Sequence, residues 1–305
     1  MASLSVLPAD LLTRPAAQST RLVARGFLDA AVRAAGRLTG ARGREDAAAL
    51  HDFRVALRRL RTTLRAYRPE LKDGIPVSLE HSLHAIAAAT NRAREAEVAI
   101  AWLRPLERRL KLGERAGWHS LLERIERRRA AGLRHAADQG WGAFAAVVPR
   151  LRRGLAKPGA GSAPFAVVAR VALLKQARRL DTLLPAVHDA ADPRAHRARI
   201  AAKRLRYLLE ALVGVVPAAA ALVKRLKTLQ DGLGELHDVL ELESEVRVAA
   251  TTRRRDQKIG LLALARRLRA RRTALYARLQ VRWLGQDGSW ARDIEAALRP
   301  QARSA

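Results

Sequence analysis

One pattern of residues occurs twice in this chain, and it limits the fold more than any other feature of the sequence. The pattern H-x-x-R-x-x-x-[RK]-R-L-R occupies residues 51–61 and, 145 positions later, residues 196–206. On a helix that turns about 100° per residue, His51, Arg54, Arg58, Arg61 and Arg65 fall within an arc of about 80°, and the apolar residues lie opposite. The two copies therefore predict two helices of one kind, each with an apolar stripe and a cationic stripe.

The duplication extends upstream and predicts two similar helical halves. Arg25 and Arg170 are 145 positions apart, as are Arg33 and Arg178. Alternating β-branched residues bounded by turn signals do not occur, so we expect an all-α fold with essentially no strand. Turn-forming residues are densest at 139–142 and 157–164, where we place the boundary between the halves. We therefore divide the chain into a first four-helix bundle (15–138), a linker (139–164), a second four-helix bundle (165–285) and a C-terminal helix with a tail (286–305).

Local signals predict where the helices start and bend. Asp46 and Asp192 are the predicted N-caps of the first and the second copy. A long helix over 78–110 is expected to bend near Asn91. A later long helix is expected to be weakened or bent in its middle by Gly232 and Gly234.

Both copies resemble the signature helices of the CHAD family, the conserved histidine α-helical domain. The second element of that family, L-G-x-x-[RH]-D, is matched by residues 233–238. The run 90–95 in the first half keeps a base, Arg94, and an acid but lacks Leu-Gly. The resemblance covers residues 15–285, which would together form one CHAD module. It implies two pseudo-symmetric four-helix bundles in tandem around a basic central channel that binds inorganic polyphosphate.

The charge balance points to a polyanionic partner. Lysine and arginine number 58 against 29 acidic residues, which gives a formal net charge of +29 and an isoelectric point near 11.7. Such a field concentrates polyanions around the protein. Only 8 of the bases are lysine, and the planar fork of arginine engages two phosphate oxygens at once. Codon bias in an Arg- and Ala-rich proteome would explain the same preference.

The cationic stripes are the candidate site. If the two halves face each other across an approximate two-fold axis, their stripes line one channel, and so many like charges need a polyanion between them. Arg94 and His237 come from the second family element. The candidate polyphosphate-binding residues are His51, Arg54, Arg58, Arg59, Arg61, His196, Arg199, Lys203, Arg204 and Arg206 from the two copies, Arg25, Arg33, Arg170 and Arg178 upstream, Arg94 and His237, and Lys224, Arg225 and Lys227 on the helix after the second copy.

Some of these residues have a second interpretation. Contact with phosphate would favour the charged form of His51 and His196 and strengthen binding in mild acid. A histidine on a helix surface is, however, often a structural hydrogen-bonding residue. His237 and Asp238 are more simply explained as residues that orient helices across the bundle. The three bases on the helix after the second copy are equally compatible with an ordinary solvated surface.

We expect no catalysis. The chain has no cysteine, so it can form no disulfide, thiolate metal site or cysteine nucleophile. It contains no H-E-x-x-H, P-loop or G-x-S-x-G motif, and we expect neither a metal nor a cofactor. The run 243–247 is similar to the E-x-E-x-K motif of the triphosphate tunnel enzymes, but it ends in arginine and lies in a helical stretch.

These observations predict a cytoplasmic protein that binds inorganic polyphosphate and is located on polyphosphate granules. No segment approaches 18 consecutive apolar residues and no secretory signal is evident, so we expect no membrane association. The alternative is a basic helical protein that binds nucleic acid without sequence specificity. Aromatic residues make up only 4% and the basic face carries no Asn or Gln, which argues against it. Protein partners are left open, with Trp283 and Trp290 as the first place to look for contacts.

Overall fold

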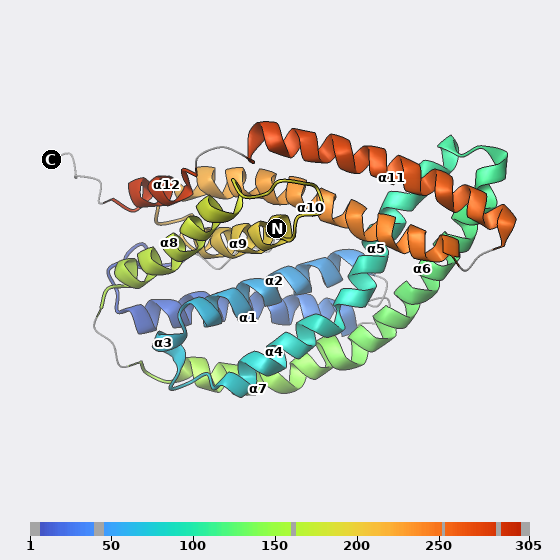
Figure 1. Cartoon of the computed structure of the whole chain (residues 1–305). Helices are drawn as coiled ribbons and strands as arrows, with labels where there is room; N and C mark the ends of the chain where they lie inside the picture. Colours follow the sequence, from blue (N-terminus) through green and yellow to red (C-terminus); the bar gives the residue numbers. More distant parts are fainter. Residues whose placement is uncertain (1–6, 40–45, 160–162, 252–253, 285–287, 300–305) are drawn as a thin grey trace.

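The computed structural model describes residues 7–39, 46–159, 163–251, 254–284 and 288–299, and 83% of them are helical (Figure 1). No strand occurs in these ranges, where the β-type pairing is limited to an isolated bridge between Pro15 and Pro164. The prediction of an all-α fold is therefore confirmed.

The chain folds into helices joined by short connections. The first part forms α1 (Ala16–Thr39), α2 (Ala47–Ala66), α3 (Arg68–Leu71), α4 (Val77–Ala89), α5 (Asn91–Leu103), α6 (Arg115–Ala136) and α7 (Ala143–Ala156). Two 3₁₀ turns, η2 (Arg104–Arg109) and η3 (Leu112–Glu114), lead from α5 to α6, and a π-helical turn, η4 (Ala137–Gly142), leads from α6 to α7. The second part forms α8 (Phe165–Leu183), α9 (Pro193–Glu210), α10 (Ala219–Thr251), α11 (Arg255–Arg282) and α12 (Trp290–Ala297).

Both predicted N-caps are confirmed. Asp46 accepts a hydrogen bond from the backbone N–H of Ala49 at 2.7 Å at the start of α2. Asp192 accepts one from the backbone N–H of Arg194 at 2.8 Å at the start of α9. Each carboxylate satisfies a backbone donor that has no partner within the helix. The two repeated helices therefore start where their local sequence signals place them.

The long helix expected in the first half is interrupted at Thr90, between α4 and α5, so the bend predicted near Asn91 is confirmed. Thr90 is fully buried, and its hydroxyl donates a hydrogen bond to the carbonyl three residues earlier at 2.8 Å. By contrast, α10 runs through Gly232 and Gly234 without a break. A Cβ atom at Gly232 would lie 2.9 Å from Leu279 Cδ2 of α11, so this glycine allows two helices to pack closely.

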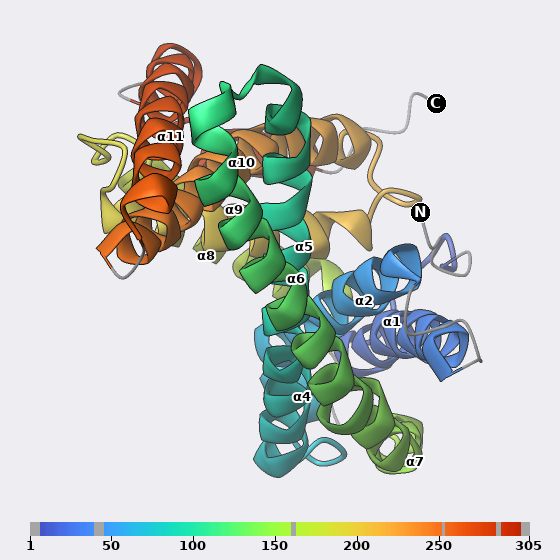
Figure 2. The same ribbon diagram turned by 90° about the vertical axis from the view of Figure 1, so that its right-hand side faces the viewer.

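The helices pack in three groups (Figures 1 and 2). The helices α1, α2, α4 and α7 form one bundle. The helices α5 and α6 leave this bundle and pack against α10 and α11 from the end of the chain. The helices α8, α9 and α12 pack in succession, and α9 also contacts α10. The second half of the chain therefore completes a bundle that α5 and α6 begin.

This packing corrects the predicted division of the chain. Residues 139–164 are not a linker, because they contain most of η4 and all of α7, which belongs to the first bundle. The glycine-rich run that suggested a break is packed: Trp141 is 4% exposed, and a Cβ atom at Gly140 would lie 3.1 Å from Thr90 Cγ2. The connection between the halves is confined to 157–164. Bundle membership also differs from the predicted 15–138 and 165–285, because α5 and α6 pack on α10 and α11.

Two glycines allow α6 and α11 to cross closely. A Cβ atom at Gly117 would lie 2.3 Å from the carbonyl oxygen of Gln257, and one at Gly260 would lie 2.2 Å from that of Glu114. Backbone atoms in a packed interior cannot move aside as the end of a flexible side chain can. The crossing therefore depends on glycine at both positions, and it holds the α5–α6 hairpin onto α11.

We expect Gly260→Ala to lower the free energy of unfolding by about 1–3 kcal/mol, because the new methyl group overlaps the backbone of η3. Gly36→Ala in α1 is the control. Nothing lies within 4 Å of the Cβ position of Gly36, so alanine should stabilise that helix by up to about 1 kcal/mol. Urea denaturation followed by circular dichroism measures both changes. Two effects of the same sign and size would contradict the close crossing.

Candidate functional site

The two repeated helices, α2 and α9, lie side by side, so their cationic stripes come together (Figure 1). One carboxylate, that of Glu210, bridges them. It accepts a hydrogen bond from Arg59 Nε of α2 at 2.6 Å and lies 3.3 Å from Arg206 Nη1 of α9. The side chains of Arg59 and Glu210 are each only 13% exposed. Glu210 stands where the first copy has Arg65, so this change of sign between the copies allows them to pack together.

Four cavities surround the contact between α2 and α9, and Arg58 lines all of them. Cavity 1, of about 80 Å³, lies between α2 and α4, and cavity 2, of about 800 Å³, between α2, α4 and α9. Cavity 3, of about 780 Å³, lies between α2, α5, α6, α9 and α10, and cavity 4, of about 470 Å³, mainly between α2, α9 and α10. We call this group the Arg58 cavities.

All the predicted residues from the two copies line the Arg58 cavities, together with three from neighbouring helices. They are His51, Arg54, Arg58, Arg59 and Arg61 of α2, His196, Arg199, Lys203, Arg204 and Arg206 of α9, Arg94 of α5, and Lys227 and His237 of α10. Lysines and arginines outnumber carboxylates among the lining residues. The fold therefore concentrates positive charge around one contact between two helices.

The structure places the other predicted residues outside the Arg58 cavities: Arg25, Arg33, Arg170, Arg178, Lys224 and Arg225. The four upstream arginines keep the register of the duplication, but α1 and α8 present them elsewhere. Arg25 donates a hydrogen bond to the carbonyl of Leu155 in α7 at 2.8 Å, and Arg170 lies 3.6 Å from Glu295 of α12. Register along a helix does not decide which neighbouring helix its face contacts, so the shared register did not bring these residues to the cavities.

Arg225 holds α12 in place. Its guanidinium pairs with Asp293, donates a hydrogen bond to Ser289 Oγ at 3.0 Å and lies 4.3 Å from the centre of the Trp290 ring. Trp290 is 3% exposed and stacks on Trp283, with ring centres 6.1 Å apart. These two tryptophans contribute to the docking of α12, and protein contacts at this end of the chain remain a prediction.

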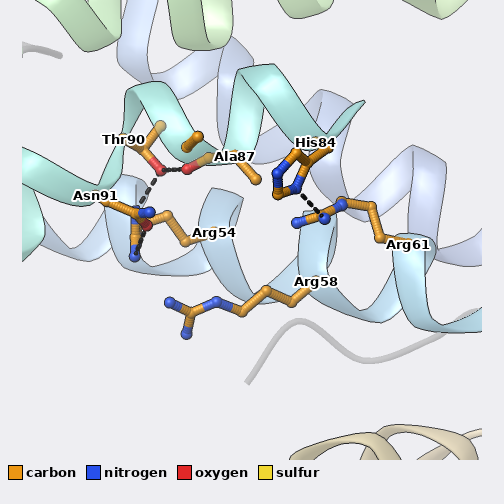
Figure 3. A pocket seen from close by; sticks show the side chains of 8 residues that line it. Arg54, Arg58, Arg61, His84, Ala87, Thr90 and Asn91 are labelled. Carbon is orange, nitrogen blue, oxygen red and sulfur yellow. Dashed lines mark hydrogen bonds between the residues drawn. The ribbon is translucent and has the colours of Figure 1, made fainter. Parts of the chain in front are cut away.

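Figure 3 shows how cavity 1 is built. Arg54 is 6% exposed and donates hydrogen bonds to the Thr90 hydroxyl and, at 3.0 Å, to Asn91 Oδ1, so it ties α2 to the break between α4 and α5. Arg61 Nη2 shares a hydrogen bond with Nδ1 of His84 in α4 at 2.7 Å. Arg58 extends away from them, and within the described part of the chain it has no hydrogen bond or ion pair. Of the three arginines, Arg58 is the one available to a ligand.

Four further residues that line the Arg58 cavities, on α4 and α6, were not among the residues predicted from the sequence. His81 and His84 lie about one turn apart on α4, and Arg124 and Arg128 lie about one turn apart on α6. Their spacing shows that each pair shares a helix face. Nothing local shows that these faces turn towards α2 and α9, so only the folded structure connects them with the site.

A comparison with protein families identifies the family of this chain. The sequence profile of the CHAD domain matches residues 22–247. The protein belongs to the CHAD domain family. It is similar in fold to the CHAD domain from the plant Ricinus communis, with 21% identity, a TM-score of 0.65 and coverage of 97% of this chain and 95% of that one. It is also similar to PptA from Streptomyces chartreusis, with 20% identity, a TM-score of 0.67 and coverage of 88% and 99%. No curated protein matches the chain.

Burial controls the charge of the histidines in this CHAD domain. The pKa values of His51, His196 and His237 are all lowered, first by burial and then by neighbouring arginines. The pKa of His237 falls to about 4, and its ring lies 4.9 Å from that of His196. These imidazoles are therefore neutral near pH 7 in the absence of a ligand. Mild acid was expected to strengthen binding by protonating these histidines. Because their pKa values are lowered, this strengthening occurs at a lower pH than for an ordinary histidine.

The other shifted groups lie where the cavities meet. Burial, Arg199 and Arg58 lower the pKa of Lys203 to about 6, so its amine is largely neutral at pH 7. Burial and then Arg58 lower the pKa of Arg54 to about 9. Burial raises the pKa of Asp238, although Arg199 and Lys203 act in the opposite direction. The low polarity and the crowding of like charges thus disfavour charge in the site without a ligand.

Within the described ranges, no group of three or more His, Cys, Asp or Glu side chains is arranged to hold a metal ion. Nor does any described helix combine the length and the apolar character needed to cross a membrane. What the Arg58 cavities present is a surface rich in guanidinium and imidazole groups, with two amines.

Replacing Glu210 by Gln should lower the free energy of unfolding by about 1–3 kcal/mol, because Arg59 and Arg206 lose the carboxylate that they share away from water. Asp52→Asn is the control, because it removes the more exposed ion pair between Asp52 of α2 and Arg37 of α1. It should cost less than about 1 kcal/mol. Urea denaturation compares the two variants. Equal losses would show that the Glu210 bridge is no stronger than a surface ion pair.

The protein without ligand should become more stable as the pH rises from about 6 to 10, because of Lys203. The pKa of this amine is about 6 in the folded protein, below its value in the unfolded chain. In this interval the unfolded chain binds a proton that the folded chain has released, so protons favour unfolding. Lys203→Met should remove this contribution. Denaturation midpoints at several pH values for both proteins provide the test, and parallel curves would contradict a lowered pKa.

Proposed function

We propose that this CHAD protein binds inorganic polyphosphate in the Arg58 cavities without catalysing a reaction on it. The observation that carries the proposal is the convergence of bases that form no ion pair. Arg58, Arg199 and Lys203 all line cavity 4, and within the described structure none of them makes a hydrogen bond or an ion pair. The charge of polyphosphate repeats along a thread, so one molecule can meet bases in several adjacent cavities.

The energetics of the site favour such a ligand. A phosphate oxygen beside each base favours the charged form that burial and neighbouring cations disfavour. The arginine forks can each hold two phosphate oxygens. Lys203 and the three lining histidines that are neutral without ligand would take up protons as the polyanion binds. Binding is therefore coupled to proton uptake and strengthens as the pH falls.

Two carboxylates that line the cavities are engaged by bases, which fits a binding role. Glu245 accepts two hydrogen bonds from Arg128, at 2.7 and 3.0 Å, and Asp231 lies 2.8 Å from Lys227. These acids neutralise neighbouring bases. A general base, or a carboxylate that holds a catalytic metal ion, has to be available to substrate or metal.

Affinity for polyphosphate would place the protein in the cytoplasm on polyphosphate granules. Nucleic acid is the alternative ligand, because a net charge of +29 attracts any polyanion. The Arg58 cavities favour a thread of phosphates. A duplex about 20 Å wide, as its groove dimensions imply, would contact only the outer surface.

Replacing Arg58 and Arg199 together by Gln should weaken polyphosphate binding by about tenfold or more, because two charge-assisted contacts are lost. The matched control replaces Arg127 and Arg153 by Gln. Both are exposed and line none of the four cavities, so the same loss of charge should weaken binding less than about threefold. Titration calorimetry at a fixed salt concentration measures the affinities. Equal losses would mean that bulk charge, and not the Arg58 cavities, binds the ligand.

Competition decides between the two classes of polyanion. Long-chain polyphosphate should displace a labelled polyphosphate at a lower phosphate concentration than either duplex DNA or orthophosphate does, because neither competitor can make several linked contacts inside the cavities. If duplex DNA competes equally well, and the Arg58 and Arg199 double variant binds both polymers normally, the nucleic-acid alternative replaces this proposal.

A further inference from the structure

Lys203 differs from every other lysine in the chain. All eight lysines lie in the described residues, and Lys203 is the one that is not exposed. It lines cavities 2 and 4, and it stands where the first copy has Arg58. Arginine stays protonated in proteins, whereas lysine can lose its proton and become a nucleophile. Of the matched residues Arg58 and Lys203, Lys203 is therefore the one whose side chain can form a covalent bond.

We propose that Lys203 is a site of acylation by small acyl phosphates. Lys203 shares the lining of cavity 4 with Arg58 and Arg199, which have no hydrogen-bond or ion-pair partner in the described structure. Two such guanidinium groups can hold the phosphate of an acyl phosphate. The phosphate and the acyl carbon then occupy a cavity whose wall includes the amine. At about 470 Å³, cavity 4 has room for a molecule of this size.

The reaction balances without a further reagent. The lone pair of Lys203 Nζ attacks the carbonyl carbon of the acyl group, and a C–N bond forms. The bond from that carbon to the phosphate oxygen breaks, and orthophosphate leaves with the electron pair while the guanidinium groups stabilise the developing charge. The amine gives its proton to water. The products are an amide on Lys203 and free orthophosphate.

The surroundings of the amine favour its reactive form. Burial, Arg199 and Arg58 lower its pKa to about 6, Arg206 acts in the same direction, and Asp238 of α10 opposes the shift. Most of the amine is therefore neutral at pH 7.5, compared with about one molecule in a thousand for an ordinary lysine. A less basic amine is also a weaker nucleophile, by about a hundredfold if amines follow the dependence known for thiols. The net advantage of Lys203 in rate is then about tenfold.

Acylation would regulate the ligand site, and this consequence rests on the proposed function. An amide cannot take up a proton when a polyanion binds, and the acyl group occupies part of cavity 4. Acylated protein should therefore bind polyphosphate more weakly than unmodified protein. The acylation itself requires only the amine, the two guanidinium groups and the cavity.

The test exposes the full-length protein to acetyl phosphate at several pH values and follows each lysine by peptide mass spectrometry. At about pH 7.5, Lys203 should be acetylated about tenfold faster than the exposed Lys224. Its rate should level off above about pH 7, whereas a lysine with the ordinary pKa of the free side chain reacts about tenfold faster per pH unit over this range. An N-hydroxysuccinimide ester of acetic acid, which carries no phosphate, should prefer Lys203 less. Equal rates and parallel pH profiles at the two lysines would overturn the proposal.

Variants and a competitor separate this proposal from the proposed function. Arg199→Gln should slow acetylation of Lys203 by acetyl phosphate more than acetylation by the ester, and Arg153→Gln should change neither. Tripolyphosphate should protect Lys203. If Lys203 reacts selectively but tripolyphosphate gives no protection, the acylation site stands and the polyphosphate site fails. If polyphosphate binds but Lys203 shows no selectivity, the acylation proposal alone is overturned.

Discussion

Two cationic helices can lie side by side only where something offsets their repulsion, and here the carboxylate of Glu210 does so. It contacts Arg59 of α2 at 2.6 Å and Arg206 of α9 at 3.3 Å, largely out of water, where such attractions are stronger than at the surface. The site depends on this contact. Once α2 is held against α9, the other bases of both stripes gather around Arg58, which has no acidic partner in the described part of the chain.

The duplicated helices are similar in pattern but not in chemistry. Where the first copy has Arg58, the second has Lys203, and where the first has Arg65, the second has Glu210. The first difference supplies an amine whose pKa is lowered to about 6, and the second supplies the bridge between the helices. A symmetric pair of copies would lack both features. The different residues at these two matched positions thus allow the two repeated helices both to pack against each other and to line the site.

The hairpin of α5 and α6 extends the site beyond the repeated helices. Because Gly117 and Gly260 allow backbone contact between α6 and α11, the hairpin is held against helices from the end of the chain. This position brings Arg94 of α5 and Arg128 of α6 to cavity 3, together with bases of α2 and α9. The basic lining therefore comes from both halves of the chain, and neither half could form it alone.

The sequence by itself determined the all-α class, the starts of the two repeated helices at Asp46 and Asp192, and the bases that each of these helices presents, because all of these follow from local periodicity and capping. The sequence did not determine which helix faces contact one another in the folded protein. Arg25 keeps the register of the duplication, yet it turns to the carbonyl of Leu155 and away from the cavities. The run around Trp141 has the composition of a linker, yet burial of this side chain favours a packed helical turn. Contacts between helices far apart in sequence depend on how the whole chain buries its apolar surface, so only the tertiary structure decided where the bases converge.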